Sequence, residues 1–398
     1  MKAIFHRLFM LFGLIAYFSI TAAAQKHLAG LDQILSAVQG SIRCTERQYE
    51  GTNLLIERTF RKEQLEDGKG SWLLRLEAEN VTGRPDAFDV RAVFSRRSGT
   101  AKATAVAVHF DFGGWATDNY VMAPASVYNG NRYRVLGNGY NPAYTPDMLF
   151  DPHLPLTISN NPRLSMEPGG LSFIELQTGN LATPAVCFYS PREGKGFILL
   201  TEQQTRWGNS GLTMVENVRR DSCTISVIAP AVRGMAPDFG DFHPSGDKAP
   251  DWRVGDEVSI RMRVYVFNAR QIPDLLEKFM IVRKDVTGPN HPRDQLPMSQ
   301  SLEWGRTICS NNFIQAPVGS YYKPENNDHF QLGWVSGMMN SYPMLATGDE
   351  KERRRVMAEL DFVTGALQGR SGYFYGGCFS NGVLRGDKEA GDSHLITA

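Results

Sequence analysis

Hydrophobic and polar residues alternate with a period of two through much of the chain between Thr52 and Phe267. Segments such as SWLLRLEAENVTG, ATAVAVHFDF and EVSIRMRVYVF keep this alternation, and Gly, Pro, Asn or Asp residues separate them. Alternation of this kind predicts half-buried β-strands bounded by turns. Because no helical pattern intervenes, we predict a large antiparallel β-sandwich over residues 25–267.

One long interruption divides the predicted strands. Residues 113–161 are rich in Asn, Tyr and Pro and lack a sustained alternation. Long structured insertions of this kind usually carry function, since the scaffold does not need them. Binding residues are therefore expected in this segment.

After Phe267 the apolar residues recur at helical spacing. In IPDLLEKFMIVRKDV, the side chains of Leu275, Phe279 and Val282 share one face of the predicted helix. The same spacing returns in LPMSQSLEWGRTICSNNF and FQLGWVSGMMNSYPMLA, where Pro343 is expected to kink or end the helix. Over residues 268–398 we predict stacked helical hairpins.

The last helical segment, EKERRRVMAELDFVTGAL, is amphipathic. Val356, Leu360 and Val363 form its predicted buried stripe, while residues 350–355 are predicted to face water. About four helical segments follow the strands, which is too few to close a toroid of helical hairpins. The chain is therefore expected to end before such a domain is complete.

The first 24 residues have the features of a secretory signal peptide. Lys2 and Arg7 precede an apolar stretch, and Ala22, Ala23 and Ala24 supply the small residues of a cleavage site before Gln25. The apolar stretch is shorter than the roughly 20 residues of a membrane span. We expect a periplasmic or extracellular protein without a transmembrane segment after cleavage.

Charge and cysteine content exclude several classes of partner and site. The chain has 42 Lys plus Arg and 42 Asp plus Glu, with a sequence pI of about 7.1, so no basic field is available for nucleic acid. Its five cysteines form no CxxC motif, which argues against a zinc knuckle. Cys187 and Cys223 lie in strand-like segments of one domain, and an exported protein could pair them as a disulfide.

The insertion contains a candidate sugar-binding set. Its aromatic and amide residues alternate, and the candidates are Trp115, Asn119, Tyr120, Tyr128 and Asn131. Sugars present apolar faces and rings of hydroxyls, so a site for them needs flat aromatic surface beside fixed donors and acceptors. The alternative is a turn-rich loop whose Asn and Gly residues serve backbone geometry.

The helical region supplies a candidate catalytic acid, Asp328. Glycoside cleavage needs a carboxyl group beside the leaving oxygen, and aromatic walls raise the pKa of such a group. The alternative role is a helix N-cap, because Asp328 precedes a predicted helix. His329 is adjacent in sequence, and Gln331 and Trp334 follow at spacings that place them on the same side of that helix.

Further candidates come from the last part of the chain. Tyr373 and Tyr375 lie in a Gly-bounded loop that is a candidate cover for the same site. A second carboxyl is needed for hydrolysis, and the candidates for it are Asp361, Asp387, Glu389 and Asp392, of which we favour Asp387. Charged groups at a chain end are usually solvated, which is the alternative for Asp387.

No cofactor is expected, with calcium as the one exception to consider. The chain lacks HExxH, GxSxG, Walker and EF-hand patterns. In DFGDFHPSGD, the side chains of Asp238, Asp241, His243 and Asp247 are candidate calcium ligands. A surface turn between strands is the favoured interpretation of this segment.

The order of signal peptide, large sandwich, linking helix and helical segments resembles a group of bacterial carbohydrate-active enzymes. These enzymes, from Bacteroidetes among others, join a mutarotase-like sandwich to an (α/α)-toroid and include polysaccharide lyases and glycoside hydrolases. NYVMAPASVYNGNRY and DHFQLGWVSGMMNSYPMLATGDEKERRRVMAELDFV look like the matching segments. The resemblance implies a cleft between sandwich and toroid that brings residues 115–133 and 328–334 together.

These observations favour an exported glycoside hydrolase that acts on an oligosaccharide or polysaccharide. If the substrate contains a uronic acid, Arg132 or Arg206 is a candidate to hold its carboxylate bidentately. The alternatives are a polysaccharide lyase, which would abstract a proton with Tyr or His, and a non-catalytic carbohydrate-binding protein.

Overall fold

The computed structural model describes residues 28–133, 161–167, 169–237, 242–289, 296–323, 328–332, 338–339, 341–369, 372 and 374–385. The chain divides into two compact units, Met1–Pro289 and Asn290–Ala398, and we describe each by itself. Among the described residues, no helix is both long enough and apolar enough to cross a membrane.

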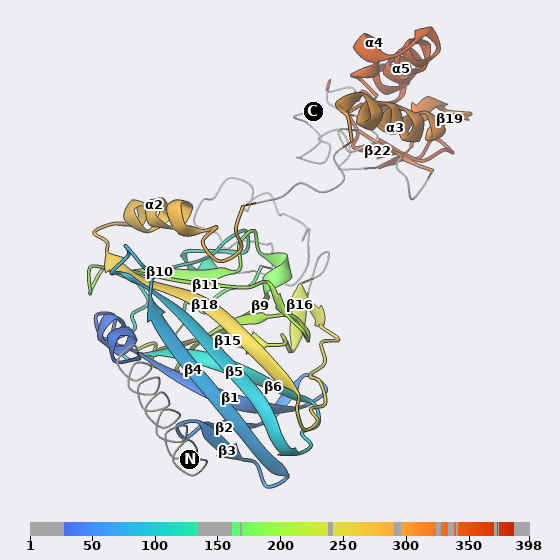
Figure 1. Cartoon of the computed structure of the whole chain (residues 1–398). Helices are drawn as coiled ribbons and strands as arrows, with labels where there is room; N and C mark the ends of the chain where they lie inside the picture. Colours follow the sequence, from blue (N-terminus) through green and yellow to red (C-terminus); the bar gives the residue numbers. More distant parts are fainter. Residues whose placement is uncertain are drawn as a thin grey trace, which may run out of the picture. The chain divides into compact units, whose positions relative to one another are not determined.

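The first unit contains two antiparallel sheets. The six-stranded sheet has the order β2-β1-β6-β15-β14-β9, and the eight-stranded sheet has the order β3-β4-β5-β18-β11-β10-β7-β8. The strands of the first sheet are β1 (Gly40–Glu50), β2 (Asn53–Thr59), β6 (Thr104–Phe112), β9 (Ser172–Gln177), β14 (Gly211–Glu216) and β15 (Cys223–Ala229). The strands of the second are β3 (Gln64–Glu66), β4 (Gly70–Asn80), β5 (Ala87–Gly99), β7 (Tyr120–Ala123), β8 (Val127–Tyr128), β10 (Ala185–Ser190), β11 (Lys195–Thr201) and β18 (Glu257–Asn268). Figure 1 shows β4, β5 and β18 running side by side.

Alternation along the strands produces the core between the sheets. Phe110 and Phe112 of β6 point inward, as do Phe188 of β10 and Phe197 of β11, and their rings pack at centroid distances of 5.0–6.0 Å. Buried aromatic side chains of this size dominate core energetics. The predicted antiparallel β-sandwich is thus confirmed by the sheet topology.

The smaller elements of the first unit connect and cover the sheets. Two-stranded ribbons are formed by β12 (Gln204–Thr205) with β13 (Gly208–Asn209) and by β16 (Met235–Pro237) with β17 (Phe242–Pro244). Short 3-10 turns are η1 (Asn129–Asn131) and η2 (Thr178–Asn180). Helix α2 (Ile272–Val282) buries Leu275, Phe279 and Val282, as predicted, against a cluster that includes Ile198 of β11. Because α2 packs on the sheet, the first unit extends to Pro289 rather than to the predicted boundary at Phe267.

The second unit differs from the predicted stack of helical hairpins. Its helices are α3 (Met298–Asn311), α4 (Met344–Thr347) and α5 (Glu350–Phe362), and η3 (Val363–Leu367) continues α5 as a π turn. Between and after them lie β19 (Phe313–Ala316), β20 (Gly319–Tyr322), β21 (Phe330–Gln331), β22 (Gly377–Cys378) and β23 (Leu384–Arg385). The described residues of this unit therefore show a mixed α/β core and do not show a toroid.

Two local predictions in this unit need correction. Residues 330 and 331 pair with β22 as a strand, so the predicted helix does not begin at Asp328, and α4 begins only after Pro343. Val356 of α5 and Val363 of η3 are buried as predicted, but Leu360 is only half-buried, and Glu352, which was predicted to face water, is buried. Glu352 belongs to a capping box with Asp349 and pairs with Arg306, which satisfies its carboxylate away from water.

All five cysteines lie within the described residues and all are free, so the predicted Cys187–Cys223 disulfide is wrong. The two residues belong to different sheets, β10 and β15, and each faces its own apolar cluster. Burial raises the pKa of both thiols, and it raises that of Cys44 to about 12.

A thiol reagent should therefore label the native protein slowly, with the half-exposed Cys309 reacting first. We also expect a reducing agent to leave the melting temperature unchanged. Mass spectrometry of the labelled protein and thermal scans with and without reductant test both points. A melting temperature that falls by several degrees on reduction would show that a disulfide is present.

Candidate functional site

The predicted sugar-binding residues of the insertion fall into two groups. Trp115 and Asn119 are buried, with exposed fractions of 3% and 2%. Tyr120 is half-buried in β7, and Tyr128 of β8 is 53% exposed, with its hydroxyl oxygen accepting from the Ala125 amide at 3.0 Å. Only the tyrosines offer surface on which a sugar ring can stack.

Trp115 is a core residue and not a stacking platform. Its ring packs edge-on against Phe188 at 5.1 Å, and its Nε1–H donates to Glu216 Oε1 at 2.7 Å. The sequence could not distinguish this role from sugar stacking, because a tryptophan with a polar partner fits both.

Asn131 likewise serves the loop itself. Its Nδ2 donates to the carbonyls of Ser126 at 2.8 Å and Pro162 at 2.7 Å, and its Oδ1 accepts from the Tyr128 amide at 3.1 Å. Asn129, Gly130 and Asn131 all have positive φ, at 51°, 65° and 50°. The turn-forming alternative therefore describes this segment.

Neither arginine proposed to hold a uronate is free. Arg132 pairs with the buried carboxylate of Glu216 and donates to the Ser165 carbonyl at 2.9 Å. Arg206 pairs with Asp256 at 2.7 Å and stacks on Trp207.

Asp328 lies at the surface of the second unit. Its side chain is 77% exposed and pairs with Lys323 at 3.2 Å, so aromatic walls do not enclose it. The His329 ring contacts Phe379 at a centroid distance of 5.5 Å. The exposed position of Asp328 does not favour the role of a general acid, which stays a prediction.

The remaining candidates of this unit are scattered. Gln331 pairs with Gly377 in the small sheet, the Tyr375 amide donates to the Leu367 carbonyl at 2.9 Å, and Asp361 is exposed on α5. Trp334, Tyr373 and Asp387 lie outside the described residues. Because each unit is described by itself, the groove predicted between residues 115–133 and 328–334 stays a prediction.

The proposed calcium ligands are only partly described. Asp247 is bound by Arg233, with Nε at 2.8 Å and Nη2 at 3.0 Å, and His243 lies in β17. Asp238 and Asp241 lie outside the described residues. Over the part of the chain that the structure describes, no group of three or more His, Cys, Asp or Glu side chains is arranged to hold a metal ion.

A pocket of about 590 Å³ lies at the β9 edge of the six-stranded sheet, and Tyr133 and Asn161 of the insertion line it. We call it the β9 pocket. Its lining is Tyr133, Asn161, Pro162, Arg163, Leu164, Ser165, Met166, Glu167, Leu171, Phe173, Ile174, Glu175, Gly234, Met235 and Phe242. Aromatic and aliphatic side chains predominate, with a few polar groups among them, as in many small-molecule sites.

A row of polar residues crosses the outer face of this sheet and ends in the β9 pocket. Arg43 pairs with His109, His109 with Ser226, Ser226 with Thr213, and Thr213 with Glu175. Residues opposite one another in an antiparallel ladder point to the same face. Five strands thus place this row on the side of the sheet away from the sandwich core.

His109 at the middle of the row is fixed and neutral. Its two ring nitrogens lie 2.7 Å from Thr45 Oγ1 and 2.7 Å from Ser226 Oγ. Burial, together with the charges of Arg43 and Arg47, lowers its pKa to about 2. His109 therefore stiffens the sheet beneath the site and does not titrate near neutral pH.

Glu175 at the end of the row is a half-buried carboxyl of the β9 pocket. Burial raises its pKa, and this is only partly offset by the Gly234 amide, which donates to Oε2 at 3.0 Å, and by the charges of Arg47 and Arg233. Glu167 lines the same pocket and supplies a second carboxyl. A raised pKa is the direction that suits a carboxyl to the role of general acid.

The alternation of residues in β9 indicates the direction of the Glu175 side chain. In LSFIELQTGN, Phe173, Glu175 and Gln177 alternate with inward apolar residues, so their outward direction follows from the strand pattern. The strand pattern does not predict the pocket itself. Its other wall includes Gly234, Met235 and Phe242, which lie in or next to a ribbon some 60 residues later in the chain.

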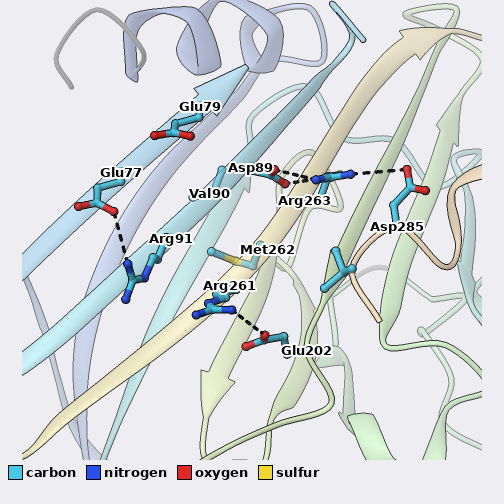
Figure 2. A pocket seen from close by; sticks show the side chains of 11 residues that line it. Glu77, Glu79, Asp89, Val90, Arg91, Glu202, Arg261, Met262, Arg263 and Asp285 are labelled. Carbon is cyan, nitrogen blue, oxygen red and sulfur yellow. Dashed lines mark hydrogen bonds and ion pairs between the residues drawn. The ribbon is translucent and has the colours of Figure 1, made fainter. Parts of the chain in front are cut away.

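A second pocket, of about 370 Å³, lies on the outer face of the eight-stranded sheet. Figure 2 shows Arg263 between Asp89 and Asp285, Arg91 directed to Glu77, and Arg261 directed to Glu202. Arg263 binds Asp89 through two hydrogen bonds of 2.5 and 2.7 Å. Each guanidinium of this pocket has a carboxylate partner, so none is left for an anionic ligand.

No family model and no curated protein matches the chain. Solved structures that it resembles include a Klebsiella pneumoniae protein provisionally assigned as an aldose 1-epimerase, with 11% identity and a TM-score of 0.33 over 58% of this chain and 56% of that one. Galactose mutarotase-like proteins of Clostridium acetobutylicum and Lactobacillus casei match with 10% and 14% identity, TM-scores of 0.29 and 0.27, over 52% and 50% of this chain and 60% and 64% of theirs.

This chain thus spans less than two thirds of the length of these neighbours. At such scores the likeness carries no conclusion about activity, and the sandwich assignment rests on the strand order of this chain.

Proposed function

We propose that this chain is an exported carbohydrate-processing protein of the glycoside hydrolase type, with the β9 pocket as its sugar site. The observation that supports this most is that two carboxyl groups, Glu175 and Glu167, line one largely apolar pocket and that burial raises the pKa of Glu175. Glycoside hydrolysis needs a carboxyl pair in which one member stays protonated.

Each part of the pocket has a role in this proposal. Phe173 and Phe242 offer aromatic surface to the apolar face of a sugar, and Asn161 and the Gly234 backbone lie among its polar groups. Glu175, as the protonated carboxyl, donates to the leaving oxygen. Glu167 is the base or nucleophile that completes the pair.

The test is to compare wild-type protein with Glu175→Gln and Glu167→Gln on a panel of oligosaccharides, by measuring newly formed reducing ends. We expect turnover to fall by about 10² to 10⁴ in Glu175→Gln, the range typical of a lost general acid, with ligand binding retained. Gln keeps the acceptor for the Gly234 amide, so the fold should be unaffected.

Glu202→Gln is the matched control, because Glu202 lies in the other pocket and pairs with Arg261 at 3.5 Å at the surface. Unchanged turnover in Glu175→Gln would exclude this residue from the mechanism. Ultraviolet absorbance from unsaturated products would instead indicate a lyase, and saturable binding without any product would indicate a binding protein.

A further inference from the structure

A fully buried carboxyl, that of Glu359, lies at the centre of the second unit. It projects from α5 and is 0% exposed. Its Oε1 accepts from the Tyr322 amide of β20 at 3.0 Å, and its Oε2 accepts from Ser341 Oγ. This one side chain thus joins three segments that are distant in sequence.

The carboxyl of Glu359 has no cationic partner among the described residues. The titratable and charged groups nearest to it are Tyr322 of β20, Cys309 of α3, and Glu352 and Arg355 of α5. Arg355 and Arg306 are engaged elsewhere, because Arg355 lies over the Phe313 ring and donates to Ser310, and Arg306 binds Glu352. An ionised Glu359 would be a buried charge held by two neutral donors, which is costly.

The packing around Glu359 depends on the segments that it joins. Tyr322, Met344 and Val356 form one buried cluster, with Phe313 and Leu345 packed against it. The Tyr322 hydroxyl is buried and has no hydrogen-bond partner within the described part of the chain, so it does not donate to the Glu359 carboxyl.

We propose that Glu359 is a pH-sensitive latch of the second unit. With the carboxyl protonated, α5, β20 and residues 341–345 pack closely. With the carboxyl ionised, the two hydrogen bonds remain, but the cost of keeping a charge away from water destabilises the packed arrangement, and the segments separate more often.

The expected pH range follows from the direction of the shift. Burial raises the pKa of Glu359 from 4.5 to about 7. Since the folded state holds the proton more tightly than the unfolded state does, stability is fully present below about pH 4.5 and declines as pH rises. The decline ends near pH 7, where the folded form has also lost its proton.

Hydrogen exchange of the full chain, followed by mass spectrometry at pH 5 and pH 8 with labelling times scaled for intrinsic exchange, tests the latch. In peptides that cover residues 319–322 and 350–362, we expect protection to fall on the order of 70-fold from pH 5 to pH 8 in the wild type. Glu359→Gln should show little change between the two values.

Glu350→Gln is the control, since Glu350 is on the same helix but its side chain is 85% exposed. It should keep the wild-type pH dependence. Equal pH dependence in Glu359→Gln and wild type, or a flat wild type, overturns the proposal. Should Glu359→Gln fail to fold, a carbon-13 titration of the wild-type Glu359 carboxyl decides, because a midpoint near 4.5 would also overturn it.

Discussion

Replacing Asp67 with alanine is expected to lower the free energy of unfolding of the first unit by about 3–5 kcal/mol, the range typical when one member of a buried ion pair is removed. The Arg96 side chain is 0% exposed and that of Asp67 is 4% exposed. Without the carboxylate, the Arg96 guanidinium stays buried above the Trp72 ring, 4.9 Å from its centroid. Asp67 also accepts from Trp72 Nε1 at 3.0 Å and from the Lys69 amide at 2.9 Å, and both bonds would be lost.

Urea unfolding monitored by tryptophan fluorescence measures this loss. Asp89→Ala is the control, because the Asp89 side chain is 50% exposed in its pair with Arg263, and an exposed pair contributes about 1 kcal/mol or less. A similar loss of unfolding free energy in the two variants would contradict the expectation that the buried ion pair contributes more than the exposed one. Burial alone would raise the pKa of Asp67, but hydrogen bonds from Arg96, Lys69 and Trp72 lower it, so its contribution is present above pH 3.8 and lost as pH falls below that value.

The second large effect is expected for Glu216→Ala. The Glu216 side chain is 0% exposed and binds Arg132, Ser172 Oγ and Trp115 Nε1. Its removal leaves Arg132 and the nearby Arg220 buried without a carboxylate, and we expect a loss of about 3–5 kcal/mol. Arg132 also anchors the Ser165 carbonyl, so the lining of the β9 pocket should become less ordered.

Two measurements separate these consequences. Urea unfolding gives the change in stability, and limited proteolysis of the native protein reports on residues 161–167. Glu257→Ala is a suitable control, since its side chain is 47% exposed in an ion pair with Arg75. If Glu216→Ala is as stable and as protease-resistant as the control, Glu216 does not hold the pocket wall.

The stability that Glu216 contributes depends on pH in the same direction as the contribution of Asp67. Burial would raise it, but hydrogen bonds from Arg132, Ser172 and Trp115 outweigh burial and lower it. The stabilisation is therefore present above pH 4.5 and is lost as pH falls through the lower folded-state pKa. In a Glu216→Ala protein, acid should have a smaller destabilising effect than in the wild type.

The strand pattern determined the architecture of the first unit well. Alternation in segments such as ATAVAVHFDF fixes which side chains face the core, and the observed β6 buries Phe110 and Phe112 accordingly. The buried stripe of α2, formed by Leu275, Phe279 and Val282, could also be predicted from the sequence, because helical spacing places those residues on one face.

The secondary structure of the second unit was harder to predict from the sequence, for a physical reason. In FQLGWVSGMMNSYPMLA, short apolar runs fit a helix or a strand equally well, and pairing with Gly377 and Cys378 made residues 330–331 a strand. That pairing partner lies more than 40 residues later in the chain, beyond the range of any local pattern.

The sequence by itself determined that strands precede helices and that basic and acidic side chains balance, at 42 each. Only the tertiary structure decided which polar side chains already have partners. Trp115 and Arg132 bind Glu216, and Asn131 binds backbone groups of its own loop. The tertiary structure alone placed Glu175 in a pocket with Glu167, and it buried Glu359 with no cationic partner among the residues that the structure describes. Local periodicity specifies the face on which a side chain lies, whereas its pKa and its partners depend on residues that the fold brings from elsewhere in the chain.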